Sequence, residues 1–310
     1  MGQLSDKAVV LGLPGSGTEL EFVPLAGGVL NRLILTNGDK TLSAIAGLNS
    51  LEQVLNNGGF RGVPLFPFPN RLADGEYEID GKHYQFPIND RSNNNSLHGF
   101  LSRLSPKVEI LGEDSNRVAL RTTYNYRGEF EYYPFPADVE VTYVLESEAE
   151  LTIEFSVTNV SSASIPVGIG WHPYFQLNEA ADDIELKMPE VTRVLIDSRM
   201  LPTGETPLYD SFSKFAPVGP TKFDDCFIAQ SDESEYVVSL WSPKSQCGLE
   251  IWQDNQLKYI QMYIPPDRQS IAVEPMSCAI NAFQTGEGLI TLRPDESFQR
   301  KFGVRLVTEK

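Results

Sequence analysis

The segment Leu151-Thr-Ile-Glu-Phe-Ser-Val-Thr158 alternates apolar and polar residues one by one. Successive side chains of a β-strand point to opposite faces, so an alternation with a period of two predicts a strand that buries only one face. Strands of this kind are typical of antiparallel sheets whose other face meets water. The segment therefore predicts an antiparallel β-strand.

Similar runs of strand length recur along the chain at short spacing. They cover residues 118–126, 139–145, 237–241, 249–252, 259–264, 270–273 and 301–307. Turn signals such as Asp74-Gly75 and Asp80-Gly81 lie between the apolar runs and favour hairpins. One short helix is predicted at residues 50–55, and strands and helices do not alternate. We therefore predict an all-β fold, a large antiparallel β-sandwich with very few short helices.

The domain organisation follows from the same survey of the chain. A length of 310 residues is compatible with one or two domains. No linker, low-complexity tract or internal repeat divides the sequence. We therefore expect a single domain over residues 1–310.

The charge balance limits the classes of partner. The chain has 25 Lys and Arg against 42 Asp and Glu, a formal net charge of −17, and 41% of its residues are hydrophobic. This apolar content excludes a disordered or fibrous chain. Proteins that bind nucleic acid or an anionic membrane usually carry a basic patch, whereas here the basic residues are scattered among more numerous acids. We expect neither nucleic acid nor membrane among the partners.

Cysteine usage and the N-terminus predict the cellular compartment. Cys226, Cys247 and Cys278 form no CxxC pair and are odd in number, which favours free thiols in a reducing compartment. The apolar run at residues 8–13 is too short for a signal peptide or a membrane span. We therefore expect a cytoplasmic protein.

Two of the three histidines stand in unusual settings. His98 lies in Ser96-Leu-His-Gly-Phe100, and His172 lies in Gly170-Trp-His-Pro-Tyr-Phe175. An imidazole titrates near neutrality and can donate or accept a proton within hydrogen-bond reach of its target. For each histidine taken alone, a structural role remains equally open.

Glu274 is a third candidate for proton transfer. It follows the apolar run 270–273 directly and precedes a proline, which predicts a position at a strand end. A carboxyl group partly buried there would have a raised pKa and could act as a general base. Asp224-Asp-Cys-Phe227 and Phe66-Pro-Phe-Pro-Asn-Arg71 complete the polar set. Each of these motifs could also be an ordinary surface feature.

Five short motifs together resemble one known family. They are, in chain order, Asn70-Arg71, Leu97-His98-Gly99, Trp171-His-Pro-Tyr-Phe175, Asp224-Asp-Cys-Phe227 and Glu274-Pro275. This combination resembles the aldose 1-epimerase (mutarotase) family over roughly residues 20–307. The resemblance implies a galactose mutarotase-like β-supersandwich with an open carbohydrate groove, and no metal or organic cofactor.

The resemblance also implies catalytic roles. Glu274 corresponds to the base that takes the proton from the anomeric hydroxyl, and His172 to the acid that protonates the ring oxygen. The ring would open to the aldehyde and close again as the other anomer. Glu and His suit this chemistry because one proton must be removed and one delivered at two oxygens that share the anomeric carbon.

The remaining family positions imply sugar binding. Arg71 and His98 would hydrogen-bond sugar hydroxyls or the ring oxygen, and Asp224 matches the sugar-binding aspartate. Asn70 and Gln261 are further candidates for the same groove. Trp171 could stack on a sugar face or belong to the core, and Asp225 could orient a neighbouring side chain.

The substrate and the assembly are left open by the sequence. We expect a small-molecule sugar as partner and a monomer or homodimer. A free aldose is favoured over a hexose 6-phosphate because of the net charge of −17, although Arg61, Arg91 and Arg103 could bind a phosphate. A carbohydrate-binding protein without turnover is the alternative from another class. The motif His98-Gly99-Phe100 has one glycine where many family members have two, which leaves the sugar preference undecided.

Overall fold

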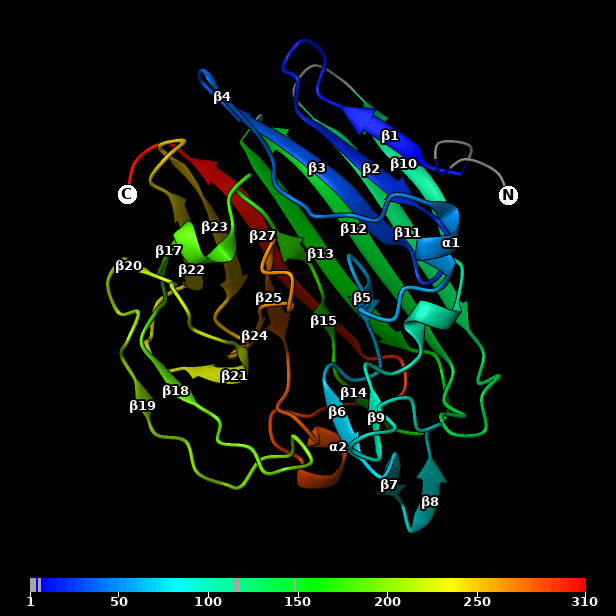
Figure 1. The fold of residues 1–310 in the computed structure, drawn as a ribbon. Helices are drawn as coiled ribbons and strands as arrows, with labels where there is room; N and C mark the ends of the chain where they lie inside the picture. Colours follow the sequence, from blue (N-terminus) through cyan, green and yellow to red (C-terminus); the bar gives the residue numbers. More distant parts are fainter. Residues whose placement is uncertain (1–3, 5–6, 114–116, 148) are drawn as a thin grey trace.

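The computed structural model describes residues 4, 7–113, 117–147 and 149–310. Two large sheets dominate it (Figure 1). The larger sheet has nine strands, in the spatial order β10 (Lys107–Glu113), β11 (Val118–Tyr126), β12 (Ala137–Ser147), β13 (Glu150–Asn159), β27 (Ser297–Val307), β23 (Cys247–Asp254), β22 (Glu235–Ser242), β17 (Glu185–Lys187) and β20 (Ala216–Pro217). Neighbouring strands in this order pair antiparallel.

The second sheet has eight strands and carries much of the site described below. Its order is β19 (Leu208–Tyr209), β18 (Val191–Arg193), β21 (Asp224–Ala229), β24 (Tyr259–Tyr263), β25 (Ile271–Met276), β15 (Gly170–Trp171) and β5 (Pro64–Leu65), with β16 (Tyr174–Phe175) paired to β25 beside this path. These pairs are antiparallel as well.

Smaller sheets complete the fold. A four-stranded sheet contains β1 (Val9–Gly12), β2 (Glu19–Val23), β3 (Val29–Asn37) and β4 (Lys40–Ser43). Three two-stranded ribbons pair β6 (Arg71–Ala73) with β9 (Asn95–Leu97), β7 (Glu76–Ile79) with β8 (Lys82–Gln85), and β14 (Ile165–Val167) with β26 (Ile290–Leu292). At Asp80-Gly81, between β7 and β8, both residues have positive φ, as a two-residue hairpin turn requires.

The two large sheets pack face to face, with the nine-stranded sheet behind β15 and β25 in Figure 1. In β13 the apolar side chains at alternate positions are fully buried and the residues between them are half-buried. Trp171 of β15 stacks on Phe302 of β27, with ring centroids 5.9 Å apart. The alternation predicted from the sequence therefore supplies the inner face of a sandwich, and Trp171 belongs to its core.

Helices are few and short. The predicted helix at residues 50–55 is α1 (Leu51–Leu55), and the Ser50 hydroxyl caps it by accepting a hydrogen bond from the Gln53 N–H. The structure adds α2 (Ala282–Thr285) and the 3₁₀ turns η2 (Leu101–Arg103) and η3 (Ala181–Asp183), which the sequence did not predict. Each of these spans about one turn, too short to give a helical period. No helix of the described residues is long and apolar enough to cross a membrane.

Candidate functional site

Three neighbouring strands of the eight-stranded sheet carry acidic and amide groups on one face. The register pairs Gln261 of β24 with Glu274 of β25, and Asp224 of β21 with Tyr263 of β24. Residues that pair directly, or that lie two apart on one strand, share a face of the sheet. The four side chains therefore point the same way and line a single cavity.

Asp225 lies on the opposite face of β21, as the strand alternation requires. Its carboxylate accepts hydrogen bonds from the Arg193 guanidinium, at 2.9 Å from Nε and 2.6 Å from Nη2. Asp225 is therefore paired with Arg193, on the far side of the sheet from the cavity. The structure thus distinguishes the two adjacent aspartates, which the sequence could not do.

Glu274 lies inside a strand and not at a strand end, which corrects the sequence-based prediction. Strand β25 continues through Pro275 to Met276, because β25 pairs with β15 at Met276 and with β16 at Ala272. Between these two pairs, the chain on that side of β25 is not paired with it. Pro275, which has no N–H to donate, is therefore tolerated there. Glu274 is only 1% exposed, where partial burial was predicted.

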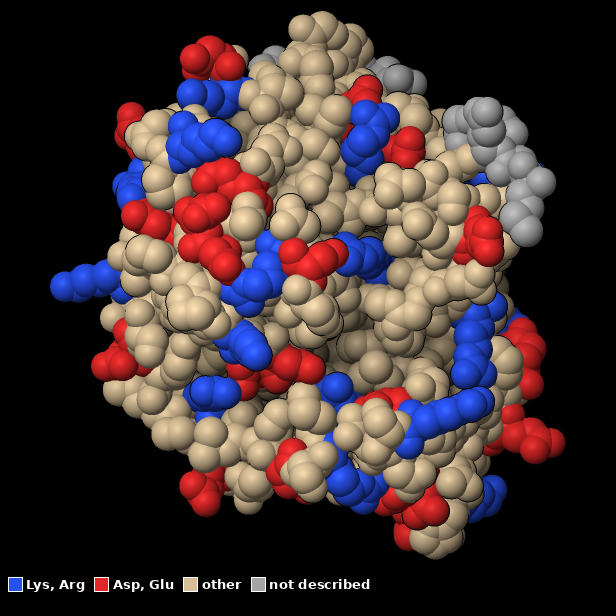
Figure 2. All heavy atoms as spheres, in the orientation of Figure 1, with Lys and Arg blue, Asp and Glu red and all other residues tan. Residues whose placement is uncertain are grey.

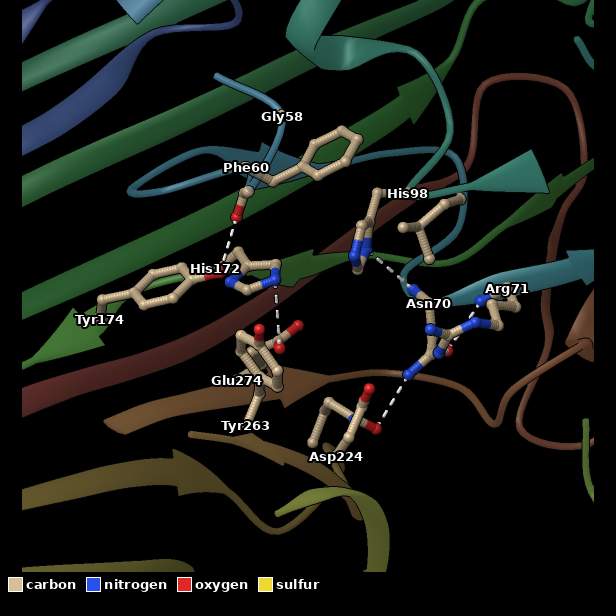
Figure 3. A pocket seen from close by; sticks show the side chains of 13 residues that line it. Gly58, Phe60, Asn70, Arg71, His98, His172, Tyr174, Asp224, Tyr263 and Glu274 are labelled. Carbon is tan, nitrogen blue, oxygen red and sulfur yellow. Dashed lines mark hydrogen bonds and ion pairs between the residues drawn. The ribbon is translucent and has the colours of Figure 1, made fainter. Parts of the chain in front are cut away.

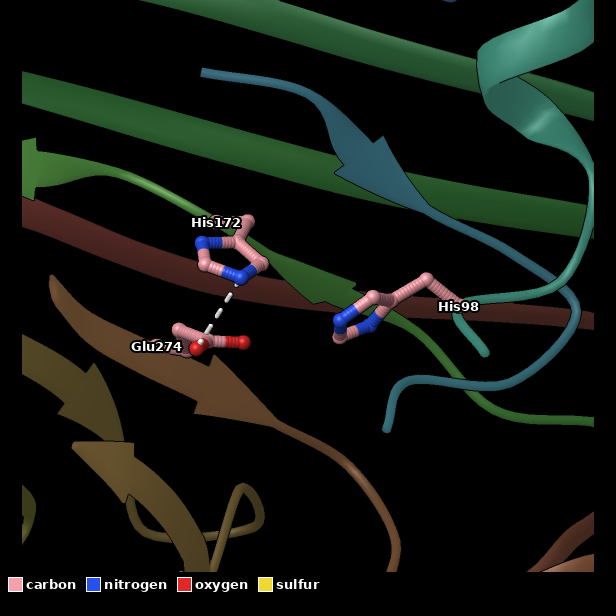
Figure 4. A group of neighbouring side chains, drawn as sticks. All are labelled: His98, His172 and Glu274. Atoms are coloured by element: carbon pink, nitrogen blue, oxygen red, sulfur yellow. Dashed lines mark ion pairs between the residues drawn. The ribbon is translucent and has the colours of Figure 1, made fainter. Parts of the chain in front are cut away.

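His172 occupies this break in the ladder and faces Glu274. The distance between His172 Nε2 and Glu274 Oε1 is 3.3 Å (Figure 4). Burial raises the pKa of the Glu274 carboxyl well above its usual range, and the nearby Asp224 carboxylate raises it further. Burial also lowers the pKa of His172, to about 3. The two groups therefore favour the neutral pair, a carboxylic acid beside a neutral imidazole, with one transferable proton on the carboxyl group.

A stack of side chains fixes the His172 ring. The ring lies parallel to the Tyr174 ring with centroids 5.0 Å apart, and the Tyr174 hydroxyl donates to the Gly59 carbonyl at 2.9 Å. The Arg61 guanidinium covers the Tyr174 ring at 4.0 Å. The backbone N–H of His172 donates to the Val63 carbonyl at 3.1 Å. His172 is therefore held in place both by its backbone hydrogen bond and by the packing of its ring.

His98 follows β9 and has a left-handed backbone conformation, with φ of 61°. Its Nδ1 accepts a hydrogen bond from the Asn70 backbone N–H at 3.0 Å, so a neutral ring carries its proton on Nε2. Burial lowers the pKa of His98 well below its usual value. The ring lies edge-on to His172, with centroids 5.1 Å apart. His98 is thus a neutral hydrogen-bond donor beside His172.

Amide groups link the binding candidates to one another. Asn70 Nδ2 donates to Gln261 Oε1 at 2.9 Å, and Gln261 Nε2 donates to Asp224 Oδ1 at 3.1 Å. Arg71 Nε donates to Asp90 Oδ2 at 3.1 Å. Both ends of the Gln261 amide are therefore engaged by protein groups, as is Asn70 Nδ2. Arg71 and Asp224 keep polar atoms that these bonds do not use.

The seven residues predicted from the sequence all line one cavity of about 220 Å³. They are Asn70, Arg71, His98, His172, Asp224, Gln261 and Glu274. Figure 3 shows the labelled side chains converging from different strands and loops, and Figure 2 shows that this face of the molecule is hollowed near its centre. The structure thus brings together motifs separated by up to about 200 residues of chain.

Several lining residues were not assigned a role from the sequence. They are Gly58, Gly59, Phe60, Leu97, Tyr174 and Tyr263. Phe60 packs its ring edge against His98 with centroids 4.7 Å apart. Tyr174 lies within one of the quoted motifs, which was a usable signal, whereas Gly58-Gly59-Phe60 resembles an ordinary loop.

His98, His172 and Glu274 lie close enough together to be compared with a cation site. One possible ligand atom from each of the three lies within 4.8 Å of the others. However, a histidine that binds a metal usually donates its second ring N–H to an acceptor. His98 Nδ1 instead accepts a backbone N–H, which leaves Nε2 protonated in the neutral ring. The donor set therefore does not fit a resident cation.

The fold and the site define a class: β-sandwich proteins with a buried His–Glu pair on the floor of an open polar cavity. The family model described as aldose 1-epimerase matches residues 15–305. The chain belongs to the aldose 1-epimerase family.

Individual relatives agree with this assignment. An uncharacterized protein of Escherichia coli K12, YihR, is 30% identical over 255 residues, which are 79% of each chain. Human galactose mutarotase is 27% identical over 239 residues, covering 70% of this chain and 64% of the human protein. A galactose mutarotase-like protein from Clostridium acetobutylicum has the same fold, with a TM-score of 0.84, 23% identity, and coverage of 94% and 93% of the two chains.

Proposed function

We propose that this protein is an aldose 1-epimerase that interconverts the α and β anomers of a free aldose. The observation that carries the proposal is the buried pair of His172 and Glu274, whose facing atoms are 3.3 Å apart on the floor of the cavity. Ring opening of a hemiacetal needs one group that removes a proton and one that supplies a proton, placed side by side. This pair meets both requirements.

In the proposed reaction Glu274 takes the proton of the anomeric hydroxyl while His172 gives a proton to the ring oxygen. The bond between the anomeric carbon and the ring oxygen breaks, and its electron pair stays on the oxygen. The product is the open-chain aldehyde. Rotation about the bond between C1 and C2 presents the other face of the carbonyl, and the reverse transfers close the ring as the other anomer.

The protonation state of the His172–Glu274 pair suits this cycle. The neutral pair carries one transferable proton, which the raised pKa of Glu274 and the lowered pKa of His172 place on the carboxyl group. Moving this proton from Glu274 to His172 makes the carboxylate a base and the imidazole an acid. Anomer exchange returns both groups to their starting states, so no external proton is consumed.

The proposed substrate contacts come from Arg71, His98 and Asp224. The Nε2–H of His98 and the guanidinium of Arg71 are donors for the ring oxygen or hydroxyls, and Asp224 is an acceptor. Asn70 donates to Gln261, and Gln261 in turn donates to Asp224. We therefore assign these two amides to positioning Asp224 and not to direct sugar contact.

A neutral sugar is favoured over a hexose 6-phosphate by the charges at the cavity. Among the described residues that line it, Arg71 is the one permanent cation, and Asp90 pairs with it. Arg61 is stacked on Tyr174 and donates to the Ala46 carbonyl, and Arg103 lines a separate cavity. Arg91 is exposed and does not line the cavity.

The test is the anomerisation of freshly dissolved α-D-glucose and α-D-galactose, followed by polarimetry or proton NMR. The wild-type protein should accelerate the change of at least one sugar, and His172→Ala and Glu274→Gln should each remove the acceleration. Binding without acceleration by the wild type would instead identify a carbohydrate-binding protein. Full activity in Glu274→Gln would refute the role of Glu274.

A further inference from the structure

The cation of the candidate site has two carboxylate groups as possible partners. Arg71 of β6 and Asp224 of β21 enter the same cavity from different strands (Figure 3). Burial raises the pKa of Asp224, and the charge of Arg71 acts against this rise, so the two groups attract each other. Among the described residues, however, Arg71 forms its ion pair with Asp90, which does not line the cavity. Asp90 therefore holds the guanidinium from outside the cavity.

The backbone places Asp90 next to Arg71. In the ribbon of β6 and β9, Ala73 pairs with Asn95, and Asn95 also forms an antiparallel bridge with Asp90. The N–H of Asp90 and the N–H of Asn95 each donate to the carbonyl of the other residue at 3.1 Å. Ala73, Asn95 and Asp90 are thus in register, and Arg71, two residues before Ala73, lies on their face of the ribbon.

The Asp90 carboxylate is itself held in place by its own loop. Ser92 Oγ donates to Oδ1 at 3.1 Å, and Asn93 Nδ2 donates to Oδ1 at 3.1 Å and to Oδ2 at 3.0 Å. Burial alone would raise the pKa of Asp90, but hydrogen bonds from Asn93, Arg71 and Ser92 outweigh it, so the pKa is lowered. The carboxylate is therefore ionised and has a fixed orientation.

This ion pair fixes the plane of the Arg71 guanidinium. Nε donates to Asp90 Oδ2 at 3.1 Å, and Nη1 donates to Asn70 Oδ1 at 3.4 Å. The side chains of Arg71 and Asp90 are only 13% and 11% exposed, so water screens their attraction little. No hydrogen bond between described residues engages Nη2. A planar group held at two of its three nitrogens leaves the third, Nη2, available to a ligand.

We propose that Asp90 is a positioning residue for sugar binding, which keeps Arg71 from pairing with Asp224 across the cavity. With Asp90 in place, the guanidinium and the Asp224 carboxylate both remain available to sugar hydroxyls. Without it, the attraction between opposite charges in a mostly buried site would join Arg71 to Asp224, and the pair would fill space that the sugar needs. This inference rests on the proposed function, because it concerns binding of the same sugar.

The central test is Asp90→Asn, which removes the charge and keeps the size of the side chain. KM should rise about tenfold while kcat stays within about threefold, because the variant leaves His172 and Glu274 untouched. Polarimetry on the sugar that the wild type uses best measures both values. In a sugar-free crystal structure of the variant, the Arg71 guanidinium should lie within about 4 Å of the Asp224 carboxylate. An Arg71 that keeps its wild-type position would overturn the proposal.

A double-mutant cycle asks whether Asp90 acts through Arg71. Arg71→Gln removes the cation, so there is no longer a guanidinium for Asp90 to position. Asp90→Asn should then change kcat/KM by less than about twofold in the Arg71→Gln background, against about tenfold in the wild-type background. A purely structural role of Asp90 would give the same loss in both backgrounds, and that result would overturn the proposal.

A second variant and a matched control complete the set. Asn93→Ala removes two hydrogen bonds from the Asp90 carboxylate but leaves its charge, so KM should rise by a smaller factor, about threefold. Asp74→Asn makes the same exchange of carboxylate for amide directly after β6. Asp74 pairs with Arg199, at 2.8 Å, and neither residue lines the cavity. KM and kcat of this control should stay within about twofold of the wild type.

The outcomes separate this inference from the proposed function. Failure of the wild type to accelerate any sugar would contradict the proposed function. The sugar-free structure of Asp90→Asn would still decide the role of Asp90, and titration calorimetry with equilibrated glucose and galactose would add the affinities. Sugar turnover with an unchanged KM in both Asp90→Asn and Asn93→Ala would overturn the further inference alone.

Discussion

Ionisable groups are paired and partly exposed on the outer face of the nine-stranded sheet, whereas on the floor of the cavity Glu274 is buried. On the outer face, Arg305 of β27 lies between Glu150 and Glu250 on the neighbouring strands and also pairs with Glu235. On the cavity floor, Glu274 is 1% exposed, and its Oε2 has no hydrogen-bond partner among the described residues.

The comparison contrasts paired, partly exposed surface charges with a buried carboxyl group that we propose as the catalytic base. Solvated and paired charges cost little free energy and contribute little stability. A buried carboxyl group destabilises the fold when it ionises, because its charged form loses hydration. Of the ionisable groups compared here, Glu274 is the one least favourable to the stability of the fold, and it is also the group that we propose as the catalytic base.

The largest expected effect is the loss of activity on changing Glu274→Gln. Glutamine keeps the shape of the side chain but cannot take a proton, so the rate of anomerisation should fall by about 10² to 10⁴. The measurement is kcat/KM by polarimetry on the sugar that the wild type uses best. A fall of less than threefold would mean that the buried carboxyl group is structural.

A smaller loss of activity is expected for Gln261→Leu, which breaks the chain of hydrogen bonds from Asn70 through Gln261 to Asp224 in the cavity wall. Asn70 Nδ2 and Asp224 Oδ1 would each lose a partner, and for the buried Asn70 amide such a loss costs about 1 to 3 kcal/mol. Because Asp224 would no longer be fixed, KM should rise more than kcat falls. Steady-state kinetics and chemical denaturation test the two effects, and Gln299→Leu on the exposed face is the control.

The stability of Glu274→Gln should exceed that of the wild type, by about 0.5 to 2 kcal/mol at pH 8. The folded pKa of Glu274 is raised, so its favourable contribution is complete below the unfolded pKa and is lost as the pH rises through the folded value. The advantage of the variant should therefore be small near pH 4 and grow toward pH 8. Urea denaturation at both pH values measures it, and an advantage that shrinks as the pH rises would contradict the raised pKa.

The smallest effect is expected on the outer face. Glu235→Gln removes one of three acidic partners of Arg305, and unfolding free energy should change by about 0.5 kcal/mol or less. Salt should reduce this difference further, since the groups are partly exposed. Thermal denaturation at low and high salt tests this, and a change as large as that of Glu274→Gln would remove the contrast between the two regions.

Much of the architecture could be predicted from the alternation of residues. The run at residues 118–126 coincides with β11, and most other predicted runs lie within longer strands. The two-residue strands β15 and β16 and the single turn α2 could not be found, because they are too short to show a period. These short elements depend on the strands that they pack against.

The residues that line the cavity could be predicted from the sequence, but the contacts that each of them makes could not. All seven candidate residues line the cavity, and six of them lie in the five motifs that together resemble one family. That Gln261 holds Asn70 and Asp224 depends on the register between β21, β24 and β25. Register is set by contacts across the whole sheet and cannot be read from a local motif.

The opposite orientations of Asp224 and Asp225 predict where this chain tolerates insertions and deletions. Removing or adding one residue within β21 would turn Asp225 toward the cavity and Asp224 toward Arg193, or would shift the whole strand against β24. Either change would replace the acceptor at the cavity wall without altering the composition of the strand. Length variation during the divergence of related proteins should therefore accumulate in the loops on either side of β21 and be rare within it.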